Sequence, residues 1–246
     1  MEDVKLVLLS ESGKYLHVRD LKQDYHCQYG MVRKEDLTKA ATSGKAKTNK
    51  GVELAAFAPS FLDLYKKIRR APQIIPLKDL GSIITETGIN KASVIVDSGT
   101  GSGALAAFLA AIAKKVTSYE LRKDFAEIAA ENAKMLKLKN LIIKNRDIYL
   151  GIDEKKVDVI TLDLPEPWKA LGPASKAMKK GGFVVSYSPS IPQVSDFVAA
   201  SLKEGFLHLK TIEVIQREWE FEERVIRPKS QPIGHSGFMT FIRKIK

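Results

Sequence analysis

From about residue 78 to its end, the chain alternates short apolar runs with amphipathic segments, and this alternation restricts the fold more than any other feature. Runs such as "SVIVDSG" and "VDVITLD" have the length of strands, whereas "ALAAFLAAIAKK" and "FAEIAAENAKML" carry apolar residues at helical spacing. Strands that alternate with helices predict a mostly parallel sheet covered on both faces. We therefore predict an α/β fold with a Rossmann-like, doubly wound sheet, in which ligands bind at the carboxyl ends of the strands.

The expected elements of this part follow one another without an internal repeat. Helices are expected over 78–88, 104–115, 125–136, 170–180 and 194–205, and strands over 93–99, 116–120, 141–145, 157–163, 181–188, 206–221 and 237–245. The first ~65 residues are β-rich and irregular, with strands expected over 4–10 and 15–20. A further helix is expected over 60–72. The chain therefore reads as a small N-terminal β-domain followed by the α/β domain.

Composition narrows the class of protein. The chain has 246 residues, 44% of them hydrophobic, which is enough for a substantial core. No apolar run reaches the ~18 residues of a membrane helix, and the N-terminus lacks the basic start of a secretory signal. Cys27 is the only cysteine and the four histidines are scattered, so we expect no intrachain disulfide and no metal site. A cytoplasmic protein is expected.

The net charge of +11 admits two interpretations. A basic surface can serve solubility alone, or it can bind a polyanion such as nucleic acid. The charges include a cluster at the end of the predicted 60–72 helix, formed by Lys66, Lys67, Arg69 and Arg70. Charge by itself leaves both interpretations open.

A glycine-rich loop, "DSGTGSG", joins the predicted strand 93–99 to the following helix. Gly99, Gly101 and Gly103 permit a tight turn and close approach of the backbone to a ligand. The helix then begins with backbone N–H groups that lack internal partners, which is a site for ligand binding. The amides expected to take part are those of Ser102, Gly103, Ala104 and Leu105.

This loop fits two cofactors. Gly99, Gly101 and Ala104 match G-x-G-x-x-G/A, and Glu120 follows at the end of the next strand, where an acid that binds a ribose belongs. The motif alone therefore leaves NAD and S-adenosylmethionine open. Asp97, which ends the strand before the loop, favours S-adenosylmethionine, because a carboxylate suits its cationic groups better than a pyrophosphate.

Two more acids follow strands of the predicted sheet. Asp147 comes just after strand 141–145, and Asp163 ends strand 157–163. Pro165 and Pro167 stiffen the turn after Asp163, and a stiff turn can hold a catalytic group in place. The alternative role for Asp163 is an ordinary helix N-cap.

The segments "DSGTGSGALAAFLA", "SYELRKDFAEIAAEN", "RDIYLGI" and "LDLPEPW" occur here in the order and spacing found in the tRNA adenine-N1 methyltransferases that act on T-loop position 58. The chain resembles this family, and its archaeal members most. The resemblance implies a class I S-adenosylmethionine-dependent methyltransferase fold, S-adenosylmethionine as cofactor, tRNA as partner and a homotetramer. It leaves open whether adenine 57 is modified as well.

The resemblance also implies roles and boundaries. Glu120 would hold the ribose hydroxyls, Asp147 and the amide of Ile148 would contact the adenine, and Asp163 would be catalytic. The implied domains are a β-rich domain over 1–65, a linker helix and cofactor lid over 66–90, and the methyltransferase domain over 91–246. The chain departs from the family at Pro76 and Leu77, where an aromatic residue or histidine followed by proline is usual.

Two alternatives to a tRNA methyltransferase remain. A non-catalytic, tRNA-binding subunit would keep the fold but lose the glycine loop or the acids, and this chain has Asp97, Glu120, Asp163 and all three glycines. An NAD-linked oxidoreductase would share the glycine loop. Binding of S-adenosylmethionine rather than NAD would separate the second alternative from a methyltransferase.

Overall fold

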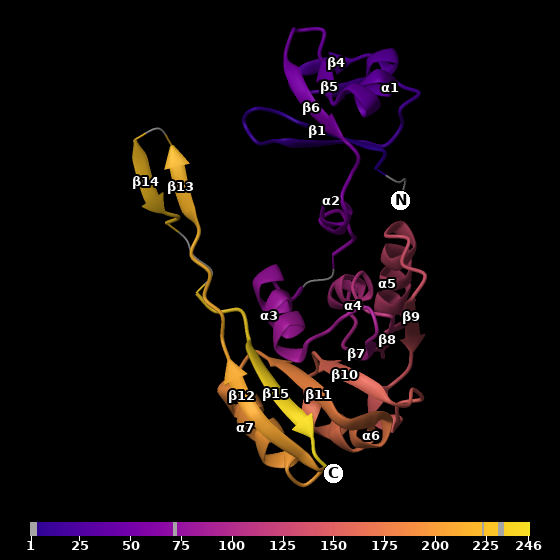
Figure 1. The fold of residues 1–246 in the computed structure, drawn as a ribbon, viewed down its shortest axis with the longest axis vertical. Coiled ribbons are helices and arrows are strands. Elements are labelled where there is room, and N and C mark those ends of the chain that lie inside the picture. Colours follow the sequence, from indigo (N-terminus) through magenta and orange to yellow (C-terminus); the bar gives the residue numbers. More distant parts are fainter. Residues whose placement is uncertain (1–3, 71–72, 223, 231–233) are drawn as a thin grey trace. The chain divides into compact units, whose positions relative to one another are not determined.

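The computed structural model describes residues 4–70, 73–222, 224–230 and 234–246 (Figure 1). The chain divides into two compact units, one that ends at Ile68 and one that begins at Arg69. Among the described residues, no helix combines the length and the apolar character needed to cross a membrane.

The first unit is built on a four-stranded sheet of order β2-β1-β6-β5. Its strands are β1 (Leu6–Leu9), β2 (Tyr15–Val18), β5 (Lys45–Lys47) and β6 (Glu53–Phe57), beside a hairpin of β3 (Tyr25–Cys27) and β4 (Gly30–Val32). Alternate residues of β1 point into a core that also receives Leu37 and Ala40 of α1 (Lys34–Ser43). The polar composition around α1 obscured this helix in the sequence, since these two residues are its only buried ones.

The helix predicted over 60–72 is much shorter than expected. It forms α2 (Phe61–Tyr65), which begins at a capping box of Ser60 and Asp63. Residues 71 and 72, the last of that prediction, lie outside the described residues. Cys27 is half-buried, and its thiol donates to the carbonyl oxygen of Gly30 at 3.3 Å.

The second unit contains the predicted doubly wound sheet, of order β12-β15-β11-β10-β7-β8-β9. The strands are β7 (Val94–Ser98), β8 (Lys115–Glu120), β9 (Leu141–Asn145), β10 (Val157–Leu162), β11 (Met178–Ser188), β12 (Phe206–Ile212) and β15 (Phe238–Lys244). Parallel pairs join β9 to β8, β8 to β7, β7 to β10 and β10 to β11, whereas β15 is antiparallel to both of its neighbours. The fold class predicted from the sequence is therefore confirmed.

Helices cover both faces of this sheet, as Figure 1 shows for α3, α4 and α5 on one side and α6 and α7 on the other. The helices are α3 (Leu77–Thr87), α4 (Ala104–Ala110), α5 (Lys123–Met135), α6 (Leu171–Ala177) and α7 (Ile191–Ser201), with 3₁₀ turns η1 (Ile148–Leu150) and η2 (Pro167–Ala170). Gly88 ends α3 in a left-handed conformation, as its sequence predicts. Strand order reverses between β7 and β10, and ligands of such sheets bind outside this point.

Several predicted elements end earlier in the structure, among them the helices expected over 104–115 and 194–205, which end at Ala110 and Ser201. The helix expected over 170–180 stops at Ala177, because Met178 already pairs with Val157 of β10. The strand expected over 206–221 stops at Ile212, because its partner β15 begins at Phe238. The apolar pattern beyond it belongs to a separate hairpin of β13 (Trp219–Glu222) and β14 (Val225–Pro228).

Candidate functional site

A small cavity lies at the point where the strand order reverses. It brings together the glycine loop after β7, the turn after β10 and the segment before α3. Its lining residues are Gln73, Ile74, Ile75, Gly99, Thr100, Gly101, Ser102, Ala104, Leu105 and Asp163. Most of the predicted loop residues and Asp163 therefore share one cavity, although some 60 residues of sequence separate the loop from the acid.

Two glycines of the loop are required by the space around them. Gly99 has φ +82°, and a Cβ there would lie 1.9 Å from the carbonyl oxygen of Asp163. Gly103 has φ +77°, and a Cβ there would lie 3.0 Å from the Cβ of Ala129 on α5. The first contact lets the loop pass directly beside the Asp163 turn, and the second lets α4 begin close against α5.

Glu120, at the end of β8, is buried and faces the glycine loop. Its carboxylate accepts hydrogen bonds from the backbone N–H groups of Gly101 and Arg122, both at 2.9 Å. A carboxylate offers about four acceptor positions. Two therefore remain for a ligand, which is the number that a pair of ribose hydroxyls requires.

The sequence predicted that Asp97 contacts the ligand, but Asp97 is not among the residues that line the cavity. It is buried, and its two oxygens accept hydrogen bonds from Ser118 Oγ of β8 at 2.5 Å and Thr161 Oγ1 of β10 at 2.6 Å. Burial raises the pKa of Asp97, while these two hydroxyl donors oppose the shift. In this arrangement Asp97 ties together three neighbouring strands behind the cavity. Its contact with a cationic ligand group stays a prediction.

Asp163 meets solvent at the cavity, yet protein surrounds its carboxyl group on most sides. This crowding raises the pKa of Asp163 to about 7, and the nearby charge of Asp97 adds to the effect. Water at the cavity screens part of that shift. The backbone N–H of Asp163 donates to Ser98 at 2.9 Å, so the residue prolongs the β10 pairing. The N-cap of η2 is Glu166, so Asp163 does not have the alternative role of helix cap.

Asp147 and Ile148 lie outside the residues that line the cavity, one strand beyond Glu120. Asp147 accepts a hydrogen bond from the N–H of Tyr149 at 2.8 Å and caps η1, and Ile148 is buried. The pairing of Glu120 with Asn145 places them at the same edge of the sheet. Within the described ranges, no group of three or more histidine, cysteine, aspartate or glutamate side chains is arranged to hold a metal ion.

Comparison with known proteins assigns the chain to a family. The family described as "tRNA methyltransferase complex GCD14 subunit" matches residues 63–227, which include the cavity. A tRNA (adenine(57)-N(1)/adenine(58)-N(1))-methyltransferase from Methanocaldococcus jannaschii is 34% identical, over 96% of this chain and 94% of that protein. This chain belongs to the tRNA methyltransferase family.

Two solved methyltransferase structures are similar to this chain over its whole length. The tRNA (m1A58) methyltransferase of Aquifex aeolicus has a TM-score of 0.80 and 26% identity, covering 100% of this chain and 99% of that one. A Thermotoga maritima structure named as an S-adenosylmethionine-dependent O-methyltransferase has a TM-score of 0.88 and 27% identity, covering 100% and 94%. The fold is that of the S-adenosylmethionine-dependent methyltransferases, which favours the methyltransferase interpretation over an oxidoreductase.

In this tRNA methyltransferase family member, the structure adds one residue that the sequence analysis missed. Asn132 of α5 is buried, and its side-chain amide donates to the carbonyl oxygens of Ser102 and Arg69 at 2.8 and 2.9 Å and accepts from the Arg69 N–H at 2.9 Å. It therefore joins the glycine loop to the start of the second unit. A polar residue between the buried Ala129 and Ala133 was the sequence sign of this role.

Proposed function

We propose that this chain transfers a methyl group from S-adenosylmethionine to N1 of adenine 58 in the T-loop of tRNA. The observation that carries the proposal is the position of Asp163 directly beside the glycine loop, in one cavity with it. The names of the family and of the relatives support the same reaction and substrate. Glu120, Asp163 and the three glycines favour a catalyst over a non-catalytic subunit.

The residues of the cavity fit the proposed cofactor. Gly99 and Gly103 let the loop lie close against the Asp163 turn and α5, and Glu120 keeps acceptor positions free for the ribose hydroxyls. S-adenosylmethionine would supply the methyl group as an electrophile attached to a sulfonium. Gly101, Ser102, Ala104 and Leu105 would contact it from the loop. Asp147 and Ile148 would contact its adenine, and residues 66–90 would form the linker and lid of the site.

Asp163 is the proposed catalytic residue. N1 of adenine has an in-plane lone pair and requires no prior loss of a proton, so the enzyme must align it and stabilise the positive charge that spreads over the ring and the amino group. A fixed carboxylate that accepts a hydrogen bond from the 6-amino group would do both. Base 58 is engaged inside folded tRNA and must first be flipped out to reach the cavity.

The decisive experiment is nucleoside mass spectrometry of tRNA incubated with the protein and S-adenosylmethionine. We expect N1-methyladenosine, and a loss of turnover on the order of 10²–10³-fold in Asp163→Ala with cofactor and tRNA still bound. A product that is only N6-methyladenosine, a methylated guanine or a ribose methylation would refute the proposal, as would a fully active Asp163→Ala enzyme. Transcripts that carry guanine at position 57 or 58 test whether adenine 57 is a second target, which the name of the M. jannaschii relative includes.

The charge of +11 supports binding of tRNA, a substrate that the enzyme would meet in the cytoplasm. The cluster Lys66, Lys67, Arg69 and Arg70 is exposed in the structure, so these side chains are available to phosphates.

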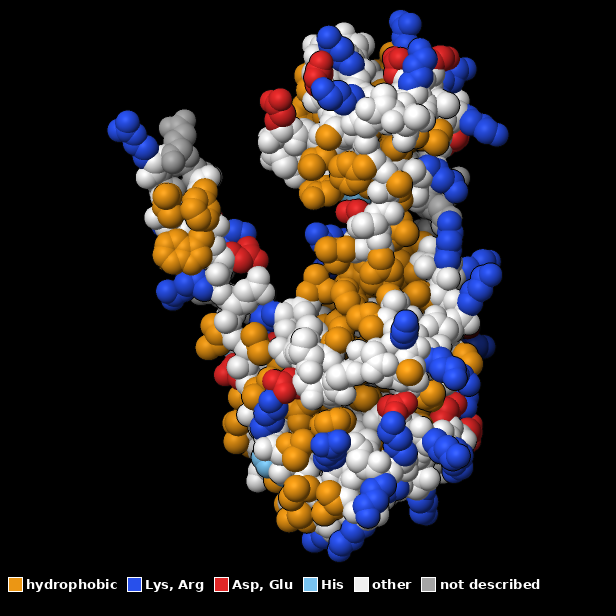
Figure 2. Space-filling model, viewed as in Figure 1, with side chains coloured by type: hydrophobic (Ala, Val, Ile, Leu, Met, Phe, Trp, Pro, Cys, Tyr) orange, Lys and Arg blue, Asp and Glu red, His pale blue; other side chains and the backbone are white. Residues whose placement is uncertain are grey.

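We also propose a homotetramer. Figure 2 shows apolar side chains on the β13–β14 hairpin, where Trp219, Phe221 and Ile226 are 52%, 74% and 59% exposed. Exposed apolar residues gathered in this way are typical of protein interfaces. Sedimentation of the wild-type protein should show a tetramer, and Phe221→Glu should give an assembly with fewer subunits. A monomeric wild-type protein would refute the assembly.

A further inference from the structure

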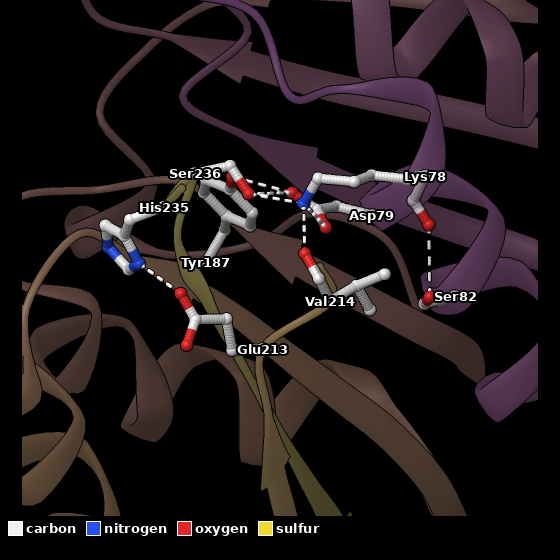
Figure 3. A network of polar contacts seen from close by, with 8 residues as sticks. All are labelled: Lys78, Asp79, Ser82, Tyr187, Glu213, Val214, His235 and Ser236. Atoms are coloured by element: carbon white, nitrogen blue, oxygen red, sulfur yellow. Dashed lines mark hydrogen bonds and ion pairs between the residues drawn. The ribbon is translucent and has the colours of Figure 1, made fainter. Parts of the chain in front are cut away.

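A buried network of charged and polar groups lies at the start of α3, next to the cavity (Figure 3). The Asp79 side chain is 0% exposed, and its carboxylate accepts hydrogen bonds from Lys78 Nζ at 2.7 Å, Ser236 Oγ at 2.7 Å and Tyr187 Oη at 3.0 Å. Ser236 precedes β15 and Tyr187 lies near the end of β11. Asp79 therefore joins three segments that lie far apart in the sequence.

Lys78 completes the network. Its ammonium group has three donors, and all three are used, by Asp79, by Ser236 Oγ at 2.5 Å and by the carbonyl oxygen of Val214 at 2.7 Å. Only 8% of the Lys78 side chain is exposed. Every proton of a nearly buried charge is thus directed at a fixed partner.

Such a network is a poor source of stability. Two charges taken out of water lose their hydration, and well-packed apolar residues of similar size stabilise a protein at least as well. What a fully satisfied buried network provides is a single geometry, because each hydrogen bond fixes both distance and direction. The network therefore matters for the geometry in which it holds α3, β11 and the segment before β15.

The network lies just after Gln73–Ile75, a segment that the proposed function assigns to the cofactor lid. This segment lines the cavity together with the glycine loop and Asp163, and Pro76 follows it as the N-cap of α3. Lys78 and Asp79 lie in the first turn of that helix, only a few residues beyond the lining. Anchoring this turn to the loops before β15 and after β12 sets how closely Ile74 and Ile75 approach the cavity.

The same carboxylate fixes Tyr187. Leu162 of β10 pairs with Ser186 of β11, so Asp163 and Tyr187 are the next residues of two adjacent parallel strands. Tyr187 is half-buried, and its hydroxyl is held by Asp79. A Cβ on Gly237 would lie 2.5 and 2.6 Å from two ring carbons of Tyr187 and 2.8 Å from its hydroxyl oxygen, so the chain before β15 packs closely against this side chain. Asp79, which belongs to the first turn of α3, thus joins that helix to Tyr187, the residue beside the proposed catalytic acid on the neighbouring strand.

We propose that Asp79 is a positioning residue for methyl transfer, which through Tyr187 and the first turn of α3 holds the two sides of the cavity at a fixed separation around Asp163. This inference rests on the proposed function. Asp79 is fully buried and does not line the cavity, so its role would be indirect. Its contribution is to keep Asp163 and the segment Gln73–Ile75 at a fixed separation across the cavity while the base is bound.

Three substitutions and one matched control test this role. Asp79→Asn removes the charge, Tyr187→Phe removes one hydrogen bond to it, and Ser236→Ala removes another, while Ser236→Thr keeps the hydroxyl. The control is Asp158→Asn, because Asp158 also accepts a partly buried hydrogen bond, from the backbone N–H of Val94 at 2.7 Å, but lies at the opposite end of β10. All are compared with the wild type in melting temperature, in kcat and KM for tRNA, and in hydrogen exchange of the amides over 73–80.

We expect Asp79→Asn to lower kcat by about 10- to 100-fold, by analogy with the loss of a residue that orients a metal ligand, while KM for tRNA changes less than threefold. Tyr187→Phe and Ser236→Ala should lower kcat by less, Ser236→Thr should restore it, and exchange over 73–80 should quicken. Asp158→Asn should lower the melting temperature alone. The combined Asp79→Asn and Tyr187→Phe variant should be no worse than Asp79→Asn.

The idea is wrong if folded Asp79→Asn retains a third or more of wild-type kcat, or if exchange over 73–80 is unchanged in it. If Asp79→Asn does not fold, the same criteria apply to Ser236→Ala and Tyr187→Phe together. A wild-type protein that makes no N1-methyladenosine refutes the proposed function instead. In that case hydrogen exchange alone decides whether Asp79 fixes the lid.

Discussion

Asn132 offers the sharpest test of how the glycine loop is held in place. Replacing it with alanine removes three hydrogen bonds, one to the buried carbonyl of Ser102 and two to the backbone of Arg69. Each contributes about 1 kcal/mol net, and a buried carbonyl left without a partner costs about 1–3 kcal/mol. Water can replace the bonds at Arg69, which is exposed, so the total loss of unfolding free energy should be about 2–4 kcal/mol.

The chain contains a matched control for this substitution. Asn145 also donates to two carbonyl oxygens, those of Glu120 and Leu121, but it is exposed. Water can therefore take the place of its amide, and Asn145→Ala should cost less than about 1 kcal/mol. Urea unfolding followed by tryptophan fluorescence suits both variants, because Trp168 and Trp219 lie in the second unit.

A second substitution tests the direction of these bonds. Asn132→Asp keeps an acceptor for the Arg69 N–H but turns an oxygen toward the carbonyls of Ser102 and Arg69. Their repulsion disfavours the ionised form and raises the pKa of the new acid in the folded state, so its stability should fall as the pH rises from 5 to 8. Asn132 does not hold the loop in this way if Asn132→Ala loses no more stability than Asn145→Ala, or if the aspartate variant shows no such pH dependence.

Four further predictions follow from the site. Glu120→Ala should weaken S-adenosylmethionine binding by roughly 1.5–3 kcal/mol for each charge-assisted bond lost, and calorimetry that finds affinity within twofold of wild type contradicts this role. Gly99→Ala should abolish cofactor binding, since its Cβ would lie 1.9 Å from the Asp163 carbonyl oxygen, and normal binding would show that the turn can move. tRNA affinity should fall steeply with salt, and neutralising Lys66, Lys67, Arg69 and Arg70 together should flatten the log–log slope, whereas an unchanged slope would identify the cluster as a solvated surface. Turnover should rise between pH 6 and 8 as Asp163, whose pKa is raised to about 7, becomes a carboxylate. Because ionisation of this acid opposes folding above its unfolded pKa of about 4, Asp163→Asn should raise the melting temperature more at pH 8 than at pH 5.

Local sequence determined most of the elements around the site. The glycine spacing of the loop and the apolar strand before it predicted β7 and α4, because backbone freedom at Gly99 and Gly103 is a property of the residues themselves. Gly88 likewise marked the end of α3. The alternation of strands and helices was sufficient to predict a doubly wound sheet, since a parallel pair requires a crossover.

In two segments the apolar pattern predicted the structure poorly, because the packing partner of the segment lies elsewhere in the chain. The alternating apolar residues beyond Ile212 predicted a continuous strand, but a strand extends only as far as its neighbour, and β15 begins at Phe238. Helix α1 carries two buried residues on an otherwise polar segment, so its pattern is weak until the sheet it packs against is known. In both segments, packing partners distant in the chain decided the structure.

Residue type and spacing were enough to propose the glycine loop, Glu120, and Asp163 in its stiff turn as a methyltransferase site. Only the tertiary structure decided which way their side chains face and what surrounds them. It turned Asp97 toward Ser118 and Thr161, placed Asn132 between Ser102 and Arg69, and buried Asp79 among groups from three segments. The physical reason is that residue type and spacing are local properties, whereas burial and hydrogen-bond partners depend on chain segments that meet only in the folded protein.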